Sequence, residues 1–211
     1  MLIVDLLTSY NCWKRYPKTS SWDMRSDYCS WDGVICDEMT GHVIEFDHSS
    51  SCLYGTIDSI SSLFQLSNLQ WLDLSYNNFS NSYISPKFSR FSRLTHLDLS
   101  NSSSEEIPLS ICTLASLVML DLERNNLHGE IPQCLEKITA LEDLHMCIFL
   151  GIFQQLSSVN LRSLNLHGNK IEGRIPQSLT NCNELQVLDL EDNHIIGTFL
   201  MLLGTLPKLQ V

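Results

Sequence analysis

The 211-residue chain has few basic residues and no cluster of them, with 13 Lys and Arg against 24 Asp and Glu and a formal net charge of −11. A protein that binds nucleic acid without sequence preference needs a basic stripe to replace the counterions of the phosphates. The composition therefore excludes nucleic acid as a partner. A run of about 20 apolar residues, the length of a membrane span, is missing as well. The apolar start at residues 1–7 is too short to span and lacks the features of a signal peptide, so we expect neither segment in this chain.

Sequence motifs of metal binding and catalysis are also missing. None of the eight cysteines forms C-x-x-C, the histidines do not fall at zinc-finger spacing, and G-x-S-x-G, P-loop and H-E-x-x-H patterns are absent. We therefore expect no metal, no cofactor and no catalytic residues, and we interpret the chain as a non-enzyme. Four cysteines lie in the first quarter of the chain, at Cys12, Cys29, Cys36 and Cys52. This concentration favours oxidised pairing and a secretory compartment.

Leucine is absent between Leu7 and Leu53 and recurs with a regular period after that segment. We divide the chain into a small N-terminal cap at residues 1–42 and a repeat array at residues 43–211. The template L-x-x-L-x-L-x-x-N-x-L fits about seven coils and a truncated eighth, whose starts are Val43, Leu69, Leu94, Leu117, Leu141, Leu161, Leu185 and Leu209. Successive starts lie 20 to 26 residues apart, which is the period of a leucine-rich repeat.

The alternation within L-x-L predicts a strand whose leucines face inward and whose intervening residues face outward. Stacked coils of this kind predict an α/β solenoid, a curved right-handed superhelix with a parallel sheet on its concave face. Short helical or irregular segments are expected on the other side. The asparagine of the template lies where the chain turns, and we expect its amide to bond backbone groups of neighbouring coils. Ser51, Ser102 and Phe149 replace this asparagine in three copies and are expected to form fewer such bonds.

Longer patterns resemble a known family. The motif L-x-G-x-I-P at residues 127–132 and its variant at 171–176 are similar to the plant extracellular class of leucine-rich repeats. Residues 28–43 resemble the N-terminal cap of plant receptor-like proteins, and residues 85–100 and 181–190 look like the Cf-type disease-resistance subgroup. The resemblance implies a ligand-recognition ectodomain in plant defence signalling, on the extracellular side of the plasma membrane or in the apoplast. It also implies a protein or peptide ligand and a co-receptor kinase as partners.

The same resemblance implies a cap disulfide between Cys29 and Cys36, the alternative being two free thiols in a cytosolic fragment. The family's cap has two adjacent cysteines where this chain has Tyr28 and Cys29, so an upstream disulfide stays open. Cys182 stands three residues before Leu185 and is expected in the core. The sequence assigns no pairing to the remaining cysteines, which are Cys12, Cys52, Cys112, Cys134 and Cys147.

The outward strand residues are expected to form one continuous concave face, on which exposed aromatic residues are candidate contacts for a protein partner. The candidate ligand-binding residues are Trp71, Tyr76, His96, Met119, Arg124, Arg162 and His167. We favour Trp71 with Tyr76 and also place Ser75 and Ser100 on this face. A column at the middle of each L-x-L is interpreted as ordinary solvated residues rather than a cation site: Asp47, Asp73, Asp98, Asp121, His145, Asn165 and Asp189. Asn78 and Asn101 begin N-x-S sequons and are expected to carry N-glycans in the secretory pathway.

Two alternatives to a receptor module stay open. One is a secreted structural or enzyme-inhibiting leucine-rich-repeat protein of the cell wall, and the other is an inactive truncated paralogue. The array stops at Val211 inside its eighth copy, from which we expect a partial or rearranged gene product.

Overall fold

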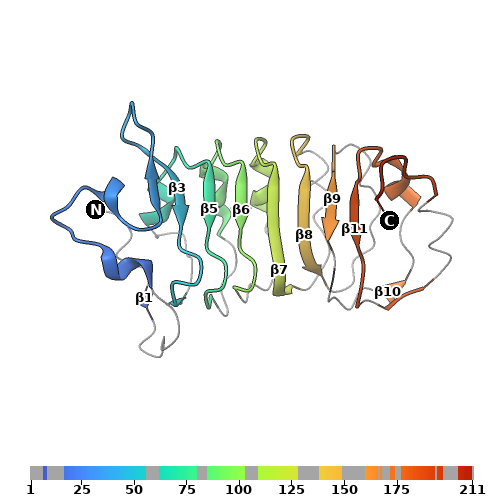
Figure 1. The fold of residues 1–211 in the computed structure, drawn as a ribbon, viewed down its shortest axis with the longest axis horizontal. Coiled ribbons are helices and arrows are strands. Elements are labelled where there is room, and N and C mark those ends of the chain that lie inside the picture. The colour runs from blue at the N-terminus through green and yellow to red at the C-terminus, as the bar shows by residue number, and fades with distance from the viewer. Residues whose placement is uncertain are drawn as a thin grey trace.

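The computed structural model shows a row of short strands stacked side by side from one end of the molecule to the other (Figure 1). It describes residues 7–8, 17–55, 62–79, 85–102, 109–127, 138–148, 160–165, 167, 172–173, 177–192, 194–196 and 204–210. Within these ranges no helix combines the length and the apolar character that crossing a bilayer requires.

Eight strands form one sheet in the order β11-β9-β8-β7-β6-β5-β3-β2. Their bounds are Val34–Cys36 (β2), Val43–Asp47 (β3), Trp71–Asp73 (β5), His96–Asp98 (β6), Met119–Leu127 (β7), Asp143–Ile148 (β8), Ser163–Asn165 (β9) and Val187–Asp189 (β11). Neighbours pair in parallel, except that β2 and β3 are antiparallel. Leu72 of β5 lies between Phe46 and Leu97, and each further strand places a leucine in the same column. This register confirms the repeat alignment and the parallel-sheet solenoid predicted from the sequence.

Two small sheets lie outside this main sheet. Strand β1 (Leu7–Thr8) pairs antiparallel with β4 (Leu53–Tyr54), and β10 (Glu172–Gly173) pairs in parallel with β12 (His194–Ile195).

The helical segments between the strands are all short 3₁₀ turns in the described part of the chain. In the repeats they are η3 (Ser62–Gln65), η4 (Pro86–Arg90), η5 (Leu109–Thr113) and η7 (Gln177–Asn181), and in the cap they are η1 (Lys18–Ser21) and η2 (Tyr28–Ser30). The start of η4 is set locally, because the Ser85 hydroxyl accepts a hydrogen bond from the Lys87 N–H and Pro86 fixes the first turn. Among the described residues, the α part of the predicted α/β class is thus reduced to single turns.

The leucines of the repeats fill the interior of the solenoid. Leu72, Leu97 and Leu120 are fully buried. The first leucine of each of these three repeat copies is fully buried as well, namely Leu69, Leu94 and Leu117. Each such side chain contributes about 1.5–3 kcal/mol by leaving water. A second layer of aromatic rings packs behind the sheet, where Phe64 lies 5.5 Å from both Phe88 and Phe91 between ring centroids. The core therefore combines the predicted leucine columns with a phenylalanine cluster that the repeat template does not contain.

The asparagine at the turn bonds neighbouring coils, as predicted. The Asn77 amide donates to the carbonyls of His48 and Leu74, while its oxygen accepts the Leu53 N–H at 2.9 Å. Asn125 repeats the pattern two coils further along the array, donating to the carbonyls of Leu99 and Leu122. Because these carbonyls and N–H groups are buried, the side chain satisfies backbone groups that the turn leaves without a ladder partner.

The cap extends the sheet and covers its first coil. Trp22 stacks on Trp31 at 4.6 Å and lies 4.7 Å from His48, whose ring is also 4.3 Å from Phe46. Gly33 permits the close approach of β2 to β3: its φ is +79°, and a Cβ there would lie 2.1 Å from the Asp47 carbonyl oxygen. The cap and the first repeat therefore share one aromatic core.

Disulfides reinforce both the cap and the repeats. Cys29 and Cys36 are joined, with Cα atoms 5.5 Å apart. Cys52 and Cys112 each form a disulfide as well, although the sequence assigned neither of them a pairing. Cys182 is buried in the core, and burial raises the pKa of its thiol. Cys12, Cys134 and the side chain of Cys147 lie outside the described residues.

Candidate functional site

The outward positions of the sheet form two columns that run across successive coils. The first column contains Glu45, Trp71, His96, Met119, Asp143, Ser163 and Val187, which are aligned by the strand register. The second column, two residues later, contains the Asp and His positions singled out in the sequence. Strand pairing thus brings residues more than 100 positions apart in the chain onto one surface.

An aromatic pair lies in the first column. The rings of Trp71 and His96, on adjacent strands β5 and β6, stack with centroids 4.3 Å apart and an angle of 19° between their planes. Both side chains are half-buried, and Met119 follows at the same register on β7. Tyr76 lies in the turn after β5 and is exposed, with a φ of 56°. The sequence named these residues but did not predict that His96 is the stacking partner of Trp71.

The second column has a structural role that the sequence interpretation missed. Each Asp or Asn in it accepts a hydrogen bond from the backbone N–H two residues later, at 2.8–3.0 Å. These bonds fix the turn that follows each strand. We interpreted the column as ordinary solvated residues, and its members are in fact half-buried. Burial raises the pKa of Asp98 to about 6, assisted by the neighbouring charges of Asp121 and Asp73.

Ser75 and Ser100 are a second correction. We expected them on the concave face, but they are only 4% and 8% exposed. The strand ends before each serine, and the next residues, Tyr76 and Asn101, take up left-handed backbone conformations. The alternation of inward and outward side chains therefore holds only within the strand, and it does not predict which side chains face outward in the turn that follows.

Ion pairs balance charge in the middle of the face. Arg124 lies 3.2 Å from Glu123, and Arg162 lies 3.4 Å from Glu142. His145 lies 3.3 Å from Asp121, whose hydrogen bond raises the pKa of the imidazole. The two arginines that we proposed as ligand contacts thus already have acidic neighbours in their own or an adjacent coil.

The last coils bring three carboxylates around one histidine. The His167 ring nitrogens lie 3.7 Å from Asp189, 3.9 Å from Glu191 and 3.8 Å from Asp192. His167, Asp189 and Glu191 each offer one ligand atom, and these atoms lie within 4.8 Å of one another, so the group has donors suited to a divalent metal. We expected no metal site, and the repeat template gave no sign of this group. The sequence shows only that acids occupy the turn positions of the coil after His167.

The two sequons lie in contrasting settings. Asn78 is exposed, whereas Asn101 is partly buried and has a φ of 49°. Glycosylation of both stays a prediction.

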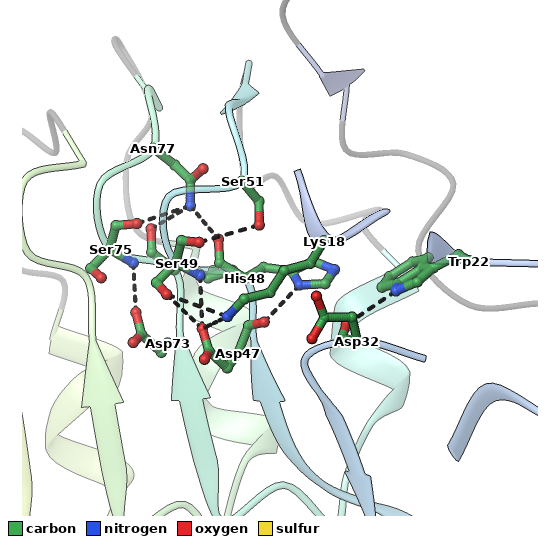
Figure 2. A network of polar contacts seen from close by, with 11 residues as sticks. Lys18, Trp22, Asp32, Asp47, His48, Ser49, Ser51, Asp73, Ser75 and Asn77 are labelled. Atoms are coloured by element: carbon green, nitrogen blue, oxygen red, sulfur yellow. Dashed lines mark hydrogen bonds and ion pairs between the residues drawn. The ribbon is translucent and has the colours of Figure 1, made fainter. Parts of the chain in front are cut away.

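The contact between cap and repeats contains a network that the sequence analysis did not single out (Figure 2). The Lys18 ammonium lies 2.5 Å from the Asp47 carboxylate, which also accepts bonds from Ser49. His48 beside them is completely buried, with its Nε2 atom unbonded, and burial lowers the pKa of its imidazole to about 4. The signal was present in the repeat template, because His48 occupies an inward leucine position of the first copy.

Comparisons with known proteins agree with this geometry. The leucine rich repeat N-terminal domain matches residues 6–37, and the leucine rich repeat matches residues 68–91, 116–138, 160–182 and 184–206. Neither of these two families is catalytic. Receptor-like protein 6 of Arabidopsis thaliana is 38% identical over 92% of this chain, and receptor-like protein Cf-9 of Solanum pimpinellifolium is 45% identical over 84%. The chain spans only 19% and 21% of these two relatives.

Solved structures share the fold. The PEPR1–AtPEP1 structure superposes on 92% of this chain with a TM-score of 0.71 and 29% identity, and this chain covers 28% of it. The HAESA ectodomain of Arabidopsis, in complex with an IDA peptide hormone, superposes with a TM-score of 0.63 over 92% of this chain and 41% of HAESA, at 24% identity. The second likeness shows the fold alone. The repeats, the cap and the receptor-like relatives together show that this chain belongs to the leucine-rich-repeat proteins, within the group of plant receptor-like proteins.

Proposed function

We propose that this chain recognises a peptide or protein ligand on the concave face of its sheet, as part of the ectodomain of a receptor-like protein in plant defence signalling. The observation that carries the proposal is the half-buried stack of Trp71 on His96 in the first outward column. Aromatic side chains with one accessible side are frequent hot spots of protein interfaces. The face around them is built by strands in strict register, so it holds these side chains in fixed positions.

Two further observations support the location and the partner. Cys29, Cys36, Cys52 and Cys112 are all disulfide-bonded, which fits an oxidising compartment on the extracellular side. The similar PEPR1 structure holds AtPEP1, and we infer a ligand of comparable kind here, with a co-receptor kinase as second partner. The division into a cap at residues 1–42 and repeats at 43–211 belongs to the same proposal.

The test is selection from a random peptide library on the immobilised, disulfide-intact 211-residue chain. We expect Trp71→Ala and His96→Ala to weaken binding of the selected peptides by about tenfold or more, since hot-spot truncation costs about 2 kcal/mol. Leu109→Ala is the matched control, because Leu109 is an exposed apolar residue of η5, away from the outward columns. Melting curves establish that the variants are folded. Binders that are insensitive to both face variants, or an absence of binders, would contradict the proposal.

A further inference from the structure

The indole N–H of Trp71 is unlike those of the cap tryptophans. Trp22 Nε1 donates to the Asp32 carbonyl at 3.2 Å, and Trp31 Nε1 donates to the Asp23 carbonyl at 3.1 Å. Trp71 Nε1 has no acceptor within the described part of the chain, although the side chain is half-buried. Because tryptophan N–H groups in such settings usually find a partner, this donor is left for a group outside the chain.

The tautomer of His96 is fixed by the residue before it. The Thr95 hydroxyl oxygen lies 2.8 Å from the Gln70 carbonyl oxygen and 2.9 Å from His96 Nδ1. A carbonyl only accepts and the hydroxyl has one proton, so the hydroxyl donates to Gln70 and the imidazole Nδ1–H donates to the hydroxyl. In the neutral ring Nε2 is then an acceptor. Among the described residues, none donates to this Nε2 atom.

Both ring atoms are in contact with solvent. Within the described ranges, His48 Nε2 is the one completely buried side-chain nitrogen or oxygen without a partner, so Trp71 Nε1 and His96 Nε2 are not buried in that way. The two rings lie on the neighbouring strands β5 and β6 and are stacked 4.3 Å apart at 19° (Figure 1). The concave face therefore presents one hydrogen-bond donor and one acceptor on two adjacent rings.

We infer that Trp71 and His96 together bind an amide group of the peptide ligand, whose C=O accepts the Trp71 N–H and whose N–H donates to His96 Nε2. This inference rests on the proposed function and names the chemical group that is recognised there. A carboxylate cannot donate to Nε2, and an ammonium or guanidinium group cannot accept from the indole. Each of them would leave one ring atom without a partner after water is displaced, which costs binding energy.

A hydroxyl group has both functions but must serve the two rings from a single oxygen. An amide has its acceptor and its donor on separate atoms, which suits two groups on separate rings. Two parts of a peptide carry an amide, namely the backbone and the side chains of Asn and Gln. The chemistry is the same in both, and substitutions in the peptide distinguish them.

The first test removes the donor or the acceptor and keeps the ring. We expect Trp71→Phe and His96→Phe each to weaken binding of the selected peptides about fivefold, the effect of one neutral hydrogen bond. His194→Phe, at an exposed histidine of β12 outside the main sheet, is the matched control and should bind like the wild type. Melting curves establish that the variants are folded. A long-range proton–nitrogen NMR spectrum at pH 8 should show the His96 proton on Nδ1.

The second test identifies the amide. An ester in place of one backbone amide removes a single N–H from the peptide, and Leu in place of Asn, or Met in place of Gln, removes a side-chain amide at similar size. At the contact position the change should weaken binding to the wild type about fivefold and leave binding to His96→Phe unchanged. Such coupling at an ester position identifies the backbone, and coupling at Asn or Gln identifies the side chain.

Wild-type binding by both Phe variants, or no coupling at any amide of the peptide, would overturn the inference. Coupling of His96 to a Ser, Thr or Tyr hydroxyl, or a His96 proton on Nε2 in the NMR spectrum, would overturn it as well. If Trp71→Ala and His96→Ala still weaken binding in these cases, the concave-face proposal stands and only the amide contact is wrong. Binding that is insensitive to both Ala variants defeats the proposed function itself.

Discussion

Asn77 connects two coils through one side chain that is 7% exposed. Its loss would leave the Leu53 N–H and the His48 carbonyl without these partners, and each orphaned buried group costs about 1–3 kcal/mol. We predict that Asn77→Ala lowers the free energy of unfolding by about 2–4 kcal/mol, measured by urea denaturation. Asn183→Ala, at an exposed turn residue, is the control and should cost less than about 0.5 kcal/mol. Equal stabilities of the two variants would show that the amide bonds are unimportant.

His48 is the residue whose charge state most affects the cap. The pKa of its imidazole falls from 6.5 to about 4 through burial, with Lys18 lowering it further and Asp47 and Asp32 opposing. Below pH 6.5 the His48 imidazole of the unfolded chain therefore binds a proton, whereas in the folded chain it stays neutral down to about pH 4. The free energy of unfolding therefore decreases as the pH falls from 6.5 to about 4. The loss amounts to about 2.5 kcal/mol by pH 4.5.

We predict that the variant His48→Phe, which keeps the ring contacts with Trp22 and Phe46, does not show the decrease in unfolding free energy that protonation of His48 causes. The pKa of Asp98 shifts in the opposite direction, so the wild-type curve alone mixes the two effects. The difference in unfolding free energy between wild type and variant, measured at pH 7.5 and pH 4.5, isolates His48. His194→Phe, at an exposed site, should follow the wild type. A difference independent of pH would mean that His48 is not held neutral.

For single residues, the sequence predicted which side chains are buried better than it predicted which side chains contact one another. The template correctly predicted that the side chains of Phe46 and His48 point into the core, because the alternation of side chains along a strand alone determines which side of the sheet they take. It could not predict the burial of the serines after the strands, since Ser75 lies two residues beyond Asp73, the last paired residue of β5, where the turn determines the side-chain direction. It also could not show that acids of one coil gather around a histidine of another, because that depends on side-chain conformations in two separate turns.

At the scale of elements, the cap hairpin of β2 and β3 depends on the Cys29–Cys36 disulfide. A bridge across a sequence separation of 7 stabilises by about 2.5 kcal/mol in the chain-entropy account. We predict that Cys29→Ser with Cys36→Ser lowers the melting temperature by about 5–10 °C in a chain of this size. The exposed aromatic core of the cap should then bind a hydrophobic dye before the repeats unfold.

Circular dichroism and dye fluorescence measure the two transitions, and peptide mapping without reduction identifies the linked pair. Cys182→Ser is a useful comparison, because it removes a buried thiol of the repeats and leaves the cap intact. Recovery of Cys29 and Cys36 as free thiols from a secreted preparation would contradict both the bridge and the extracellular location.

The strands themselves could be predicted well from the sequence, whereas the segments between them could not. Each of the seven repeat strands in the main sheet has a leucine or phenylalanine whose neighbours point outward, and the sequence alone shows this local pattern. Where the structure describes the connecting segments, they form single 3₁₀ turns, because only 20 to 26 residues complete each coil, which leaves little chain for a full α-helix on the far side. The phenylalanine cluster of Phe64, Phe88 and Phe91 fills the space behind them.

At the scale of the whole molecule, the proposed recognition depends on one surface. Parallel pairing from β3 to β11 aligns residues of seven coils, and it gives the face an aromatic end and an acidic end. The most direct measurement is a crystal structure of the 211-residue chain with a peptide selected on it. We predict an extended peptide lying across the outward side of β5 to β11, with an aromatic or apolar side chain against Trp71. A peptide bound behind the sheet, on η3 to η7, or on the cap alone would contradict the claim that the concave face recognises the ligand.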